Sequence, residues 1–158
     1  MSFWRTVGIW WVFLNVTKLM STRSNIGIVN DGGSVTGIYC HWDGYPEHNG
    51  KLLLKHYTDS ERINGLMSLG SLSILAENLY STDIHTFNNP QEGVCVAYGR
   101  DRGETGTNSR TFDNISEFEE FAGNSWSDYQ YLFNDGKWQY RKYNGKWSEL
   151  TPQVCKVG

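Results

Sequence analysis

Runs of β-branched and aromatic residues, separated by glycine-containing turns, predict where this chain forms strands. Residues 25–29 and 34–41 are two such runs on either side of an Asn-Asp-Gly-Gly turn at 30–33, which predicts a β-hairpin. Residues 93–98 form a continuous apolar run that is typical of a buried strand. We therefore expect a hairpin near the start of the domain and a separate strand in its centre.

The last third of the chain carries the clearest strand pattern. Asp135-Gly136 and Asn144-Gly145 are strong hairpin signals, and they lie nine residues apart between aromatic-rich runs. They predict a meander of three antiparallel strands between residues 129 and 150.

Helical patterns fill the middle of the chain. Residues 51–57 begin one, and the Thr-Asp-Ser-Glu sequence at 58–61 matches a capping box that opens a second helix, with Gly70 as its stop. Residues 71–79 are interpreted as a further short helix. Apolar residues three apart in 115–123 predict another.

These elements predict one α+β domain over residues 20–158. We expect an antiparallel sheet, made of the hairpin, the central strand and the meander, with two to four short helices on one face. No Pro-, Gly- or Ser-rich linker divides the chain into two domains.

Residues 1–19 are set apart as a doubtful apolar extension. Their uncharged part, between Arg5 and Lys18, has 12 residues, whereas a membrane-spanning helix needs about 20. A secretory cleavage site is missing as well. Three interpretations stay open: an anchor at a membrane surface, an element packed on the domain, or translation from an upstream start codon in place of Met20, which we favour. A membrane partner is expected only if this segment belongs to the natural protein.

Composition narrows the function classes. The net charge of −3, from 14 Lys and Arg against 17 Asp and Glu, supplies no basic field for duplex nucleic acid. Three widely spaced cysteines make neither a disulfide framework nor a zinc motif, so we expect a cytoplasmic protein without metal or cofactor. Aromatic residues make up 15% of the chain, which favours either a ring-rich core or a binding surface.

Two polar segments each leave the end of a predicted strand, and loops in that position often carry binding sites. If their parent strands are neighbours, the two segments converge on one pocket. Arginine forks suit planar anions, and exposed rings suit the face of a base. The candidate ligand-binding residues are Trp42, Asp43, Tyr45, Glu47 and His48 in the first segment, and Arg100, Asp101, Arg102 and Glu104 in the second.

Simpler interpretations compete with this pocket. The string 100–104 can be a charged turn whose Arg and Asp side chains pair with each other. Cys40 and His41 are adjacent in a strand and point to opposite faces, so they do not form a catalytic pair by themselves. A metal site at 41–48 has suitable ligand types but no recognised spacing. The aromatic meander could stack single-stranded RNA, although alternate rings of a meander are commonly core.

The sequence YCHWDGYPEHNGK at 39–51, together with GRDRGE at 99–104 and YQYLFNDGKW at 129–138, resembles a group of small uncharacterised bacteriophage and prophage proteins. The resemblance covers residues 20–138. It implies a protein made in the cytoplasm of an infected or lysogenic bacterium. It implies no catalytic residues.

These observations lead to three hypotheses. The first is a non-enzymatic phage accessory protein that binds a host protein or a small anionic, nucleotide-like ligand, in host takeover or anti-defence. The second is a small enzyme of nucleotide or phosphate-ester chemistry that uses the two polar segments. The third is single-stranded RNA binding on the aromatic sheet.

Overall fold

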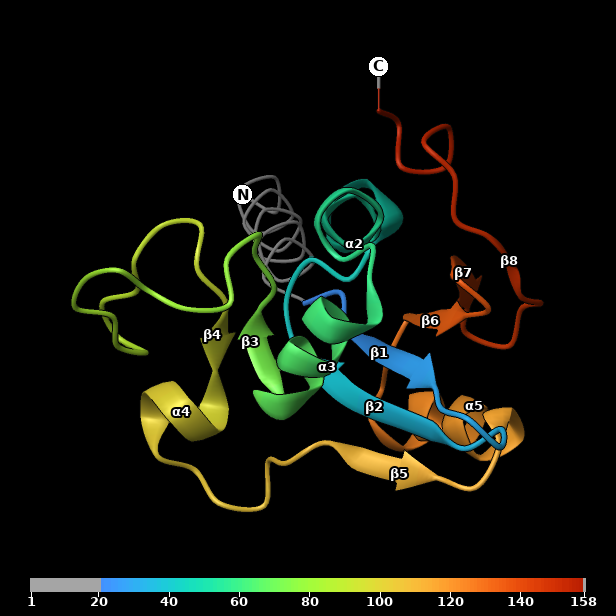
Figure 1. Cartoon of the computed structure of the whole chain (residues 1–158), viewed down its shortest axis with the longest axis horizontal. Helices are drawn as coiled ribbons and strands as arrows, with labels where there is room; N and C mark the ends of the chain where they lie inside the picture. Colours follow the sequence, from blue (N-terminus) through green and yellow to red (C-terminus); the bar gives the residue numbers. More distant parts are fainter. Residues whose placement is uncertain (1–20, 158) are drawn as a thin grey trace, which may run out of the picture.

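The fold is a mixed, open β-sheet with helices on both faces, and it forms a single α+β domain (Figure 1). The computed structural model describes residues 21–157, so the expectations for residues 1–19 fall outside it. The strands are β1 Ser24–Val29, β2 Val35–Cys40, β3 Leu72–Ile74, β4 Val96–Ala97, β5 Arg110–Phe112, β6 Tyr129–Asn134, β7 Lys137–Lys142 and β8 Ser148–Glu149. The helices are the π-helical turn η1 Pro46–Gly50, α2 Lys51–His56, α3 Ser60–Ser68, α4 Tyr98–Arg102 and α5 Ile115–Asn124.

The strand order is β4-β3-β2-β1-β6-β7-β8, with β5 also paired to β2. The predicted hairpin (β1, β2) and meander (β6, β7, β8) are both present and antiparallel. The junctions between them differ from the expected antiparallel sheet, because β1 pairs with β6 in parallel and β2 pairs with β3 in parallel. Parallel partners are distant in the sequence and leave no turn signal between them.

Alternate residues of the central strands serve two cores. Ile26 and Ile38 face one side and belong to a cluster with Leu66 of α3 and Tyr131 of β6. The other side carries a smaller cluster that contains Phe118 of α5. The helices therefore cover both faces of the sheet, α3 on one and α5 on the other, instead of the single face that we expected.

Helix ends follow the predicted chemistry with one shift. Asp59, not Thr58, caps α3, since its Oδ1 accepts the Arg62 backbone N–H at 2.8 Å. Gly70 lies directly beyond the helix with φ +72°, the left-handed conformation that ends helices. Asn114 caps α5 in the same way, by accepting the Glu117 N–H at 2.9 Å.

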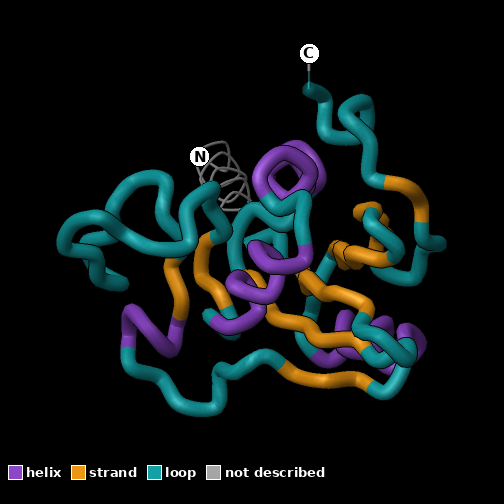
Figure 2. The backbone as a smooth tube through the Cα atoms, viewed as in Figure 1, coloured by secondary structure: helices purple, strands orange, loops and turns teal. Residues whose placement is uncertain are grey.

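Two predicted elements have a different structure. Residues 71–79 contain strand β3 followed by an extended segment, because Leu72 enters the sheet opposite the end of β2 as soon as α3 stops. A short apolar run does not distinguish strand from helix. The chain between β3 and β4 is then a long loop (Figure 2). Residues 99–104, expected to be a loop, begin inside α4, which Gly103 ends at φ +75°.

Candidate functional site

The first polar segment is held rigidly by its own small and amide residues. The buried Asn49 side chain donates from Nδ2 to Trp42 O at 3.3 Å, to Ser24 Oγ at 3.4 Å and to Cys40 Sγ at 3.4 Å. Gly44 is needed for close approach, because a Cβ there would lie 2.8 Å from Ser24 Cβ. Much of the YCHWDGYPEHNGK motif is thus explained by folding.

The predicted ligand-binding residues of this segment lie at the surface. Trp42 and Tyr45 are exposed, and the Tyr45 hydroxyl donates to Asp43 Oδ1 at 3.3 Å. His48 Nδ1 lies 2.9 Å from Asn49 Oδ1, and the Glu47 carboxylate is 3.6 Å from Lys156 Nζ. The rings of Tyr45 and His48 meet edge to face. These side chains form a surface patch whose polar groups bond with each other.

The second segment pairs with itself and with main chain. The Arg100 guanidinium donates to both carboxylate oxygens of Asp101, at 2.9 and 3.0 Å, and to the carbonyl oxygens of Leu79 and Cys95. Arg102 pairs with Glu104 at 3.2 Å in solvent. The internal pairing expected in the simpler interpretation is therefore present, although Arg100, Asp101 and Arg102 lie in α4 and not in a turn.

Asp101 and Arg100 close the outer edge of the sheet. Strand β4 is an edge strand, and Asp101 Oδ2 accepts its Ala97 N–H at 2.8 Å. His85, from the long loop, contributes Nε2 at 3.3 Å from the same oxygen. Burial tends to raise the pKa of Asp101, but the hydrogen bonds from Arg100 and Ala97 outweigh it and hold the pKa below its usual value. The cluster satisfies an exposed strand edge and anchors the loop.

The two polar segments do not converge, because their parent strands are not neighbours. Strand β3 lies between β2 and β4, and β2 and β4 run in opposite directions. After Cys40 the chain continues along β3, where the Trp42 N–H donates to Ser73 O. After β4 it leaves past the other end of β3, where the Tyr98 N–H donates to Ser71 O. Among residues 21–157, the two segments therefore leave β3 in opposite directions.

The structure also bears on the RNA-binding, metal and thiol alternatives. On the meander, Tyr131 and Trp138 are buried and Tyr143 is exposed, so its rings do not make an open stacking row. In residues 21–157, no group of three or more His, Cys, Asp and Glu side chains is arranged to hold a metal ion. Burial raises the pKa of the Cys40 thiol to about 12, which suppresses its thiolate.

A different surface hollow combines arginines with aromatic and amide groups. It has a volume of about 450 Å³ and lies on the α5 side of the sheet, between β5 and the end of α5. No carboxylate is among the residues that line it. We call it the arginine concavity, and its lining residues are Arg23, Tyr39, Ser71, Gly106, Asn108, Arg110, Phe121, Asn124, Ser125 and Trp126.

Neither guanidinium group of this concavity forms an ion pair with a carboxylate, although the Arg23 backbone N–H donates to Asp128 Oδ2 at 3.3 Å. All 17 Asp and Glu residues fall in the described part of the chain, and none of them pairs with Arg23 or Arg110. Arg23 Nε is buried without a hydrogen-bond partner. The Arg110 guanidinium lies over the Phe121 ring, 5.2 Å from its centre, which fixes its direction. Both guanidinium groups therefore keep a positive charge that no carboxylate side chain neutralises by direct pairing.

Trp126 projects from the same hollow at an energetic cost. Its side chain is 79% exposed, and its φ of +56° is unusual for a bulky residue. The Trp126 N–H donates to Gly123 O at 3.5 Å, which holds the turn after α5. An exposed indole on a strained backbone suggests selection for something other than stability.

The positive charge of Arg23 affects the pKa values of Tyr39 and His41. The Tyr39 hydroxyl lies 2.7 Å from His41 Nδ1. Burial raises the pKa of Tyr39 to about 12, although the Arg23 charge opposes the rise. Burial and the Arg23 charge together lower the pKa of His41. The Arg23 charge therefore acts on both side chains, although burial has the larger effect on each pKa.

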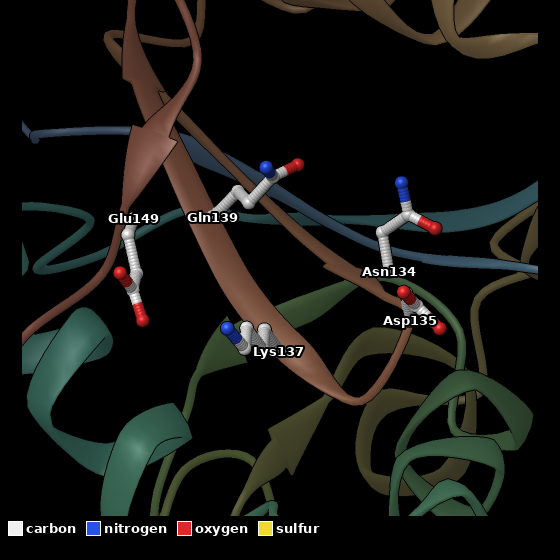
Figure 3. A pocket seen from close by; sticks show the side chains of 5 residues that line it. All are labelled: Asn134, Asp135, Lys137, Gln139 and Glu149. Carbon is white, nitrogen blue, oxygen red and sulfur yellow. The ribbon is translucent and has the colours of Figure 1, made fainter.

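Another hollow, of about 370 Å³, lacks the excess of positive charge that an anion site needs (Figure 3). Lys137 of β7 is accompanied there by Asp135 and Glu149, so carboxylates outnumber the cation. Figure 3 shows the Gln139 and Glu149 side chains pointing in different directions, without a common focus. This hollow offers no concentrated positive charge.

We found no protein-family model, no curated protein and no solved structure that matches this chain. Within the part of the chain that the structure describes, there is no helix with the length and apolarity needed to cross a membrane. The site is therefore interpreted from its own geometry.

Sequence reasoning missed Arg23, Arg110 and Trp126 as site residues. Each is a single residue in a different segment, and they approach one another only through the pairing of β2 with β5 and of β1 with β6. The available signal was Trp126 itself, a tryptophan between two serines at the end of a predicted helix, where an apolar ring has no obvious core to enter.

Proposed function

We propose that this protein binds a small anionic, nucleotide-like ligand in the arginine concavity and catalyses no reaction on it. The observation that carries the proposal is the presence of two guanidinium groups without carboxylate partners beside an exposed indole. The resemblance to phage proteins is our ground for proposing that the ligand is a metabolite or signal of the host cell.

The chemistry of the concavity supports this ligand class. Guanidinium forks match phosphate oxygens in pairs, and an indole face stacks on any base. The Asn108 and Asn124 side chains line the same hollow and offer amide donors and acceptors to a base edge. A volume of about 450 Å³ lies within the range of small-molecule sites.

Binding without catalysis is supported by the state of the candidate catalytic groups. Arg100 and Asp101, which the enzyme hypothesis required, are used to close a strand edge and anchor a loop. Cys40 is buried with a raised pKa. In the first segment, Asp43 accepts the Tyr45 hydroxyl, His48 contacts the Asn49 side chain and Glu47 pairs with Lys156.

The test is calorimetric titration of the whole chain with AMP and ATP at low and moderate salt. We expect binding that weakens as salt rises, and a loss of tenfold or more in Arg23→Ala and in Arg110→Ala. Arg102→Ala is the matched control, because Arg102 pairs with Glu104 outside the concavity. Equal affinity in all four proteins would refute the site.

A parallel experiment separates a small ligand from a host protein. The chain is purified from a bacterial host, and everything that accompanies it is identified by mass spectrometry. A nucleotide retained by the native protein and lost from Arg110→Ala supports the proposal. A host protein retained without any nucleotide, and released by Trp126→Ala, contradicts it and marks the surface as a protein interface.

A further inference from the structure

A second hollow shares one lining residue with the arginine concavity at the end of α5. It has a volume of about 480 Å³, and Asn124 lines both hollows. We call it the tyrosine concavity, and its lining residues are Ser116, Glu119, Glu120, Gly123, Asn124, Arg141, Tyr143 and Asn144.

Each hollow is lined by one exposed ring, and both ring-bearing residues contact the last turn of α5, Trp126 through its backbone and Tyr143 through its ring. Trp126 is 79% exposed and Tyr143 is 51% exposed. The Trp126 N–H donates to Gly123 O, and a Cβ on Gly123 would lie 3.4 Å from the Tyr143 hydroxyl oxygen. Trp126 and Tyr143 thus both contact Gly123 at the end of α5.

The tyrosine concavity is not a second phosphate site. The Arg141 guanidinium is already used, since it donates to Gly145 O at 3.0 Å and to Gln130 Oε1 at 3.1 Å. Glu119 accepts the Trp147 indole N–H at 2.7 Å, and Glu120 is exposed. Carboxylates repel phosphate but accept hydrogen bonds from sugar hydroxyls and base amines.

We propose that the ligand of this protein is a dinucleotide, which spans both hollows. One base stacks on Trp126 while the bridging phosphate lies at Arg23 and Arg110. The second nucleoside crosses Asn124 and stacks on Tyr143, with Glu120 accepting from its hydroxyl or amine groups. This inference rests on the proposed function and extends it from nucleotide-like ligands to those with two nucleosides.

Calorimetry with three probes tests the inference: AMP, the 3′,5′-linked dinucleotide ApA, and the 5′,5′-linked diadenosine diphosphate. We expect at least one dinucleotide to bind about tenfold or more tightly than AMP, because a second stacked base adds to affinity. The linkage that gives the larger gain identifies the geometry of the bridge.

Variants assign the gain to the second hollow. Tyr143→Ala should reduce dinucleotide affinity to that of AMP and leave AMP binding unchanged. Trp126→Ala should weaken both ligands. Tyr80→Ala is the control, because Tyr80 is 64% exposed, between Tyr143 and Trp126, but lies in the long loop. Melting curves of each variant verify that it is folded.

Two results overturn the inference without touching the proposed function. One is equal affinity for AMP and both dinucleotides. The other is a dinucleotide advantage that survives in Tyr143→Ala. If none of the three probes binds, the proposed function itself fails.

Discussion

The ring of Phe118 occupies the space that a side chain on Gly37 would need. A Cβ built on Gly37 would lie 2.8 Å from Phe118 Cε2, and one built on Gly27 would lie 3.0 Å from Cζ of the same ring. The two glycines pair across β1 and β2, so α5 packs through Phe118 directly on the backbone of the hairpin. The position of the arginine concavity depends on this contact, because α5 carries Phe121 and Asn124 into it.

Gly37→Ala should therefore lower the free energy of unfolding by about 1–3 kcal/mol, the usual cost of overpacking. Urea denaturation followed by tryptophan fluorescence measures this change. In the double variant with Phe118→Leu, the added methyl group gains room. The double variant should therefore lose less stability than the sum of the losses of the two single variants. An unchanged midpoint in Gly37→Ala would contradict the packing described.

Asp101→Asn should cost about 1.5–3 kcal/mol at neutral pH, because three donors lose a charged acceptor. The pKa of Asp101 is below its usual 3.8 in the folded protein. Its contribution is therefore complete above that value and is lost as pH falls through the lower folded pKa. The stability gap between the native protein and the variant should be constant from about pH 7 to pH 5 and narrow below pH 4.

Glu104→Gln is the control for Asp101, since the Arg102–Glu104 pair is exposed and contributes little. Chemical denaturation over this pH range measures both variants. A gap that stays constant down to pH 2 would assign the effect of Asp101→Asn to packing and not to charge.

Native thiols should be inert. Cys40, Cys95 and Cys155 are all buried and free, and burial raises the pKa of each one. We expect a chromogenic disulfide reagent to react at pH 8 only as fast as the protein opens, with three equivalents released after denaturation. Raising the pH to 9 should not produce a fast phase from Cys40. A rapid equivalent in the native protein would place a thiol at the surface.

Trp126→Gly should separate stability from function. Glycine accepts a φ of +56° without strain and the indole is mostly exposed, so the free energy of unfolding should stay equal or rise by up to about 1 kcal/mol. Nucleotide binding should be lost at the same time. A large loss of stability would instead make the indole a structural element. Thermal melting and calorimetry on one preparation answer both questions.

Local signals in the sequence specified the elements that depend on neighbouring residues. The turn at 30–33 and the Asp135-Gly136 turn both formed hairpins, and Asn114 and Gly70 mark helix ends. Strand β5 and the parallel pairs are different, because each depends on a partner far along the chain. A three-residue strand such as β5 has no pattern of its own.

For the candidate site, the sequence predicts the types of side chain but not which residues supply them. The sequence predicts arginine forks beside aromatic faces but points to Arg100 and Arg102, whereas Arg23 and Arg110 line the hollow. The difference between the pairs is whether a carboxylate forms an ion pair with the guanidinium, and this depends on tertiary structure. Adjacent Asp101 satisfies Arg100 in the fold, whereas Arg110 stacks on a ring that is 11 residues away in sequence.

The parallel pairing of β1 with β6 has a consequence for the order of events during synthesis. Ile26 and its partner Tyr131 lie at the centre of the sheet but are 105 positions apart. At about 5–20 residues per second, a ribosome takes roughly 5–20 s to proceed from one to the other. Throughout that interval the edge of β1 that pairs with β6 has no partner strand. The nascent chain is therefore exposed to wrong pairing until its last third has been made, and a chaperone that covers this edge would increase the yield of folded protein.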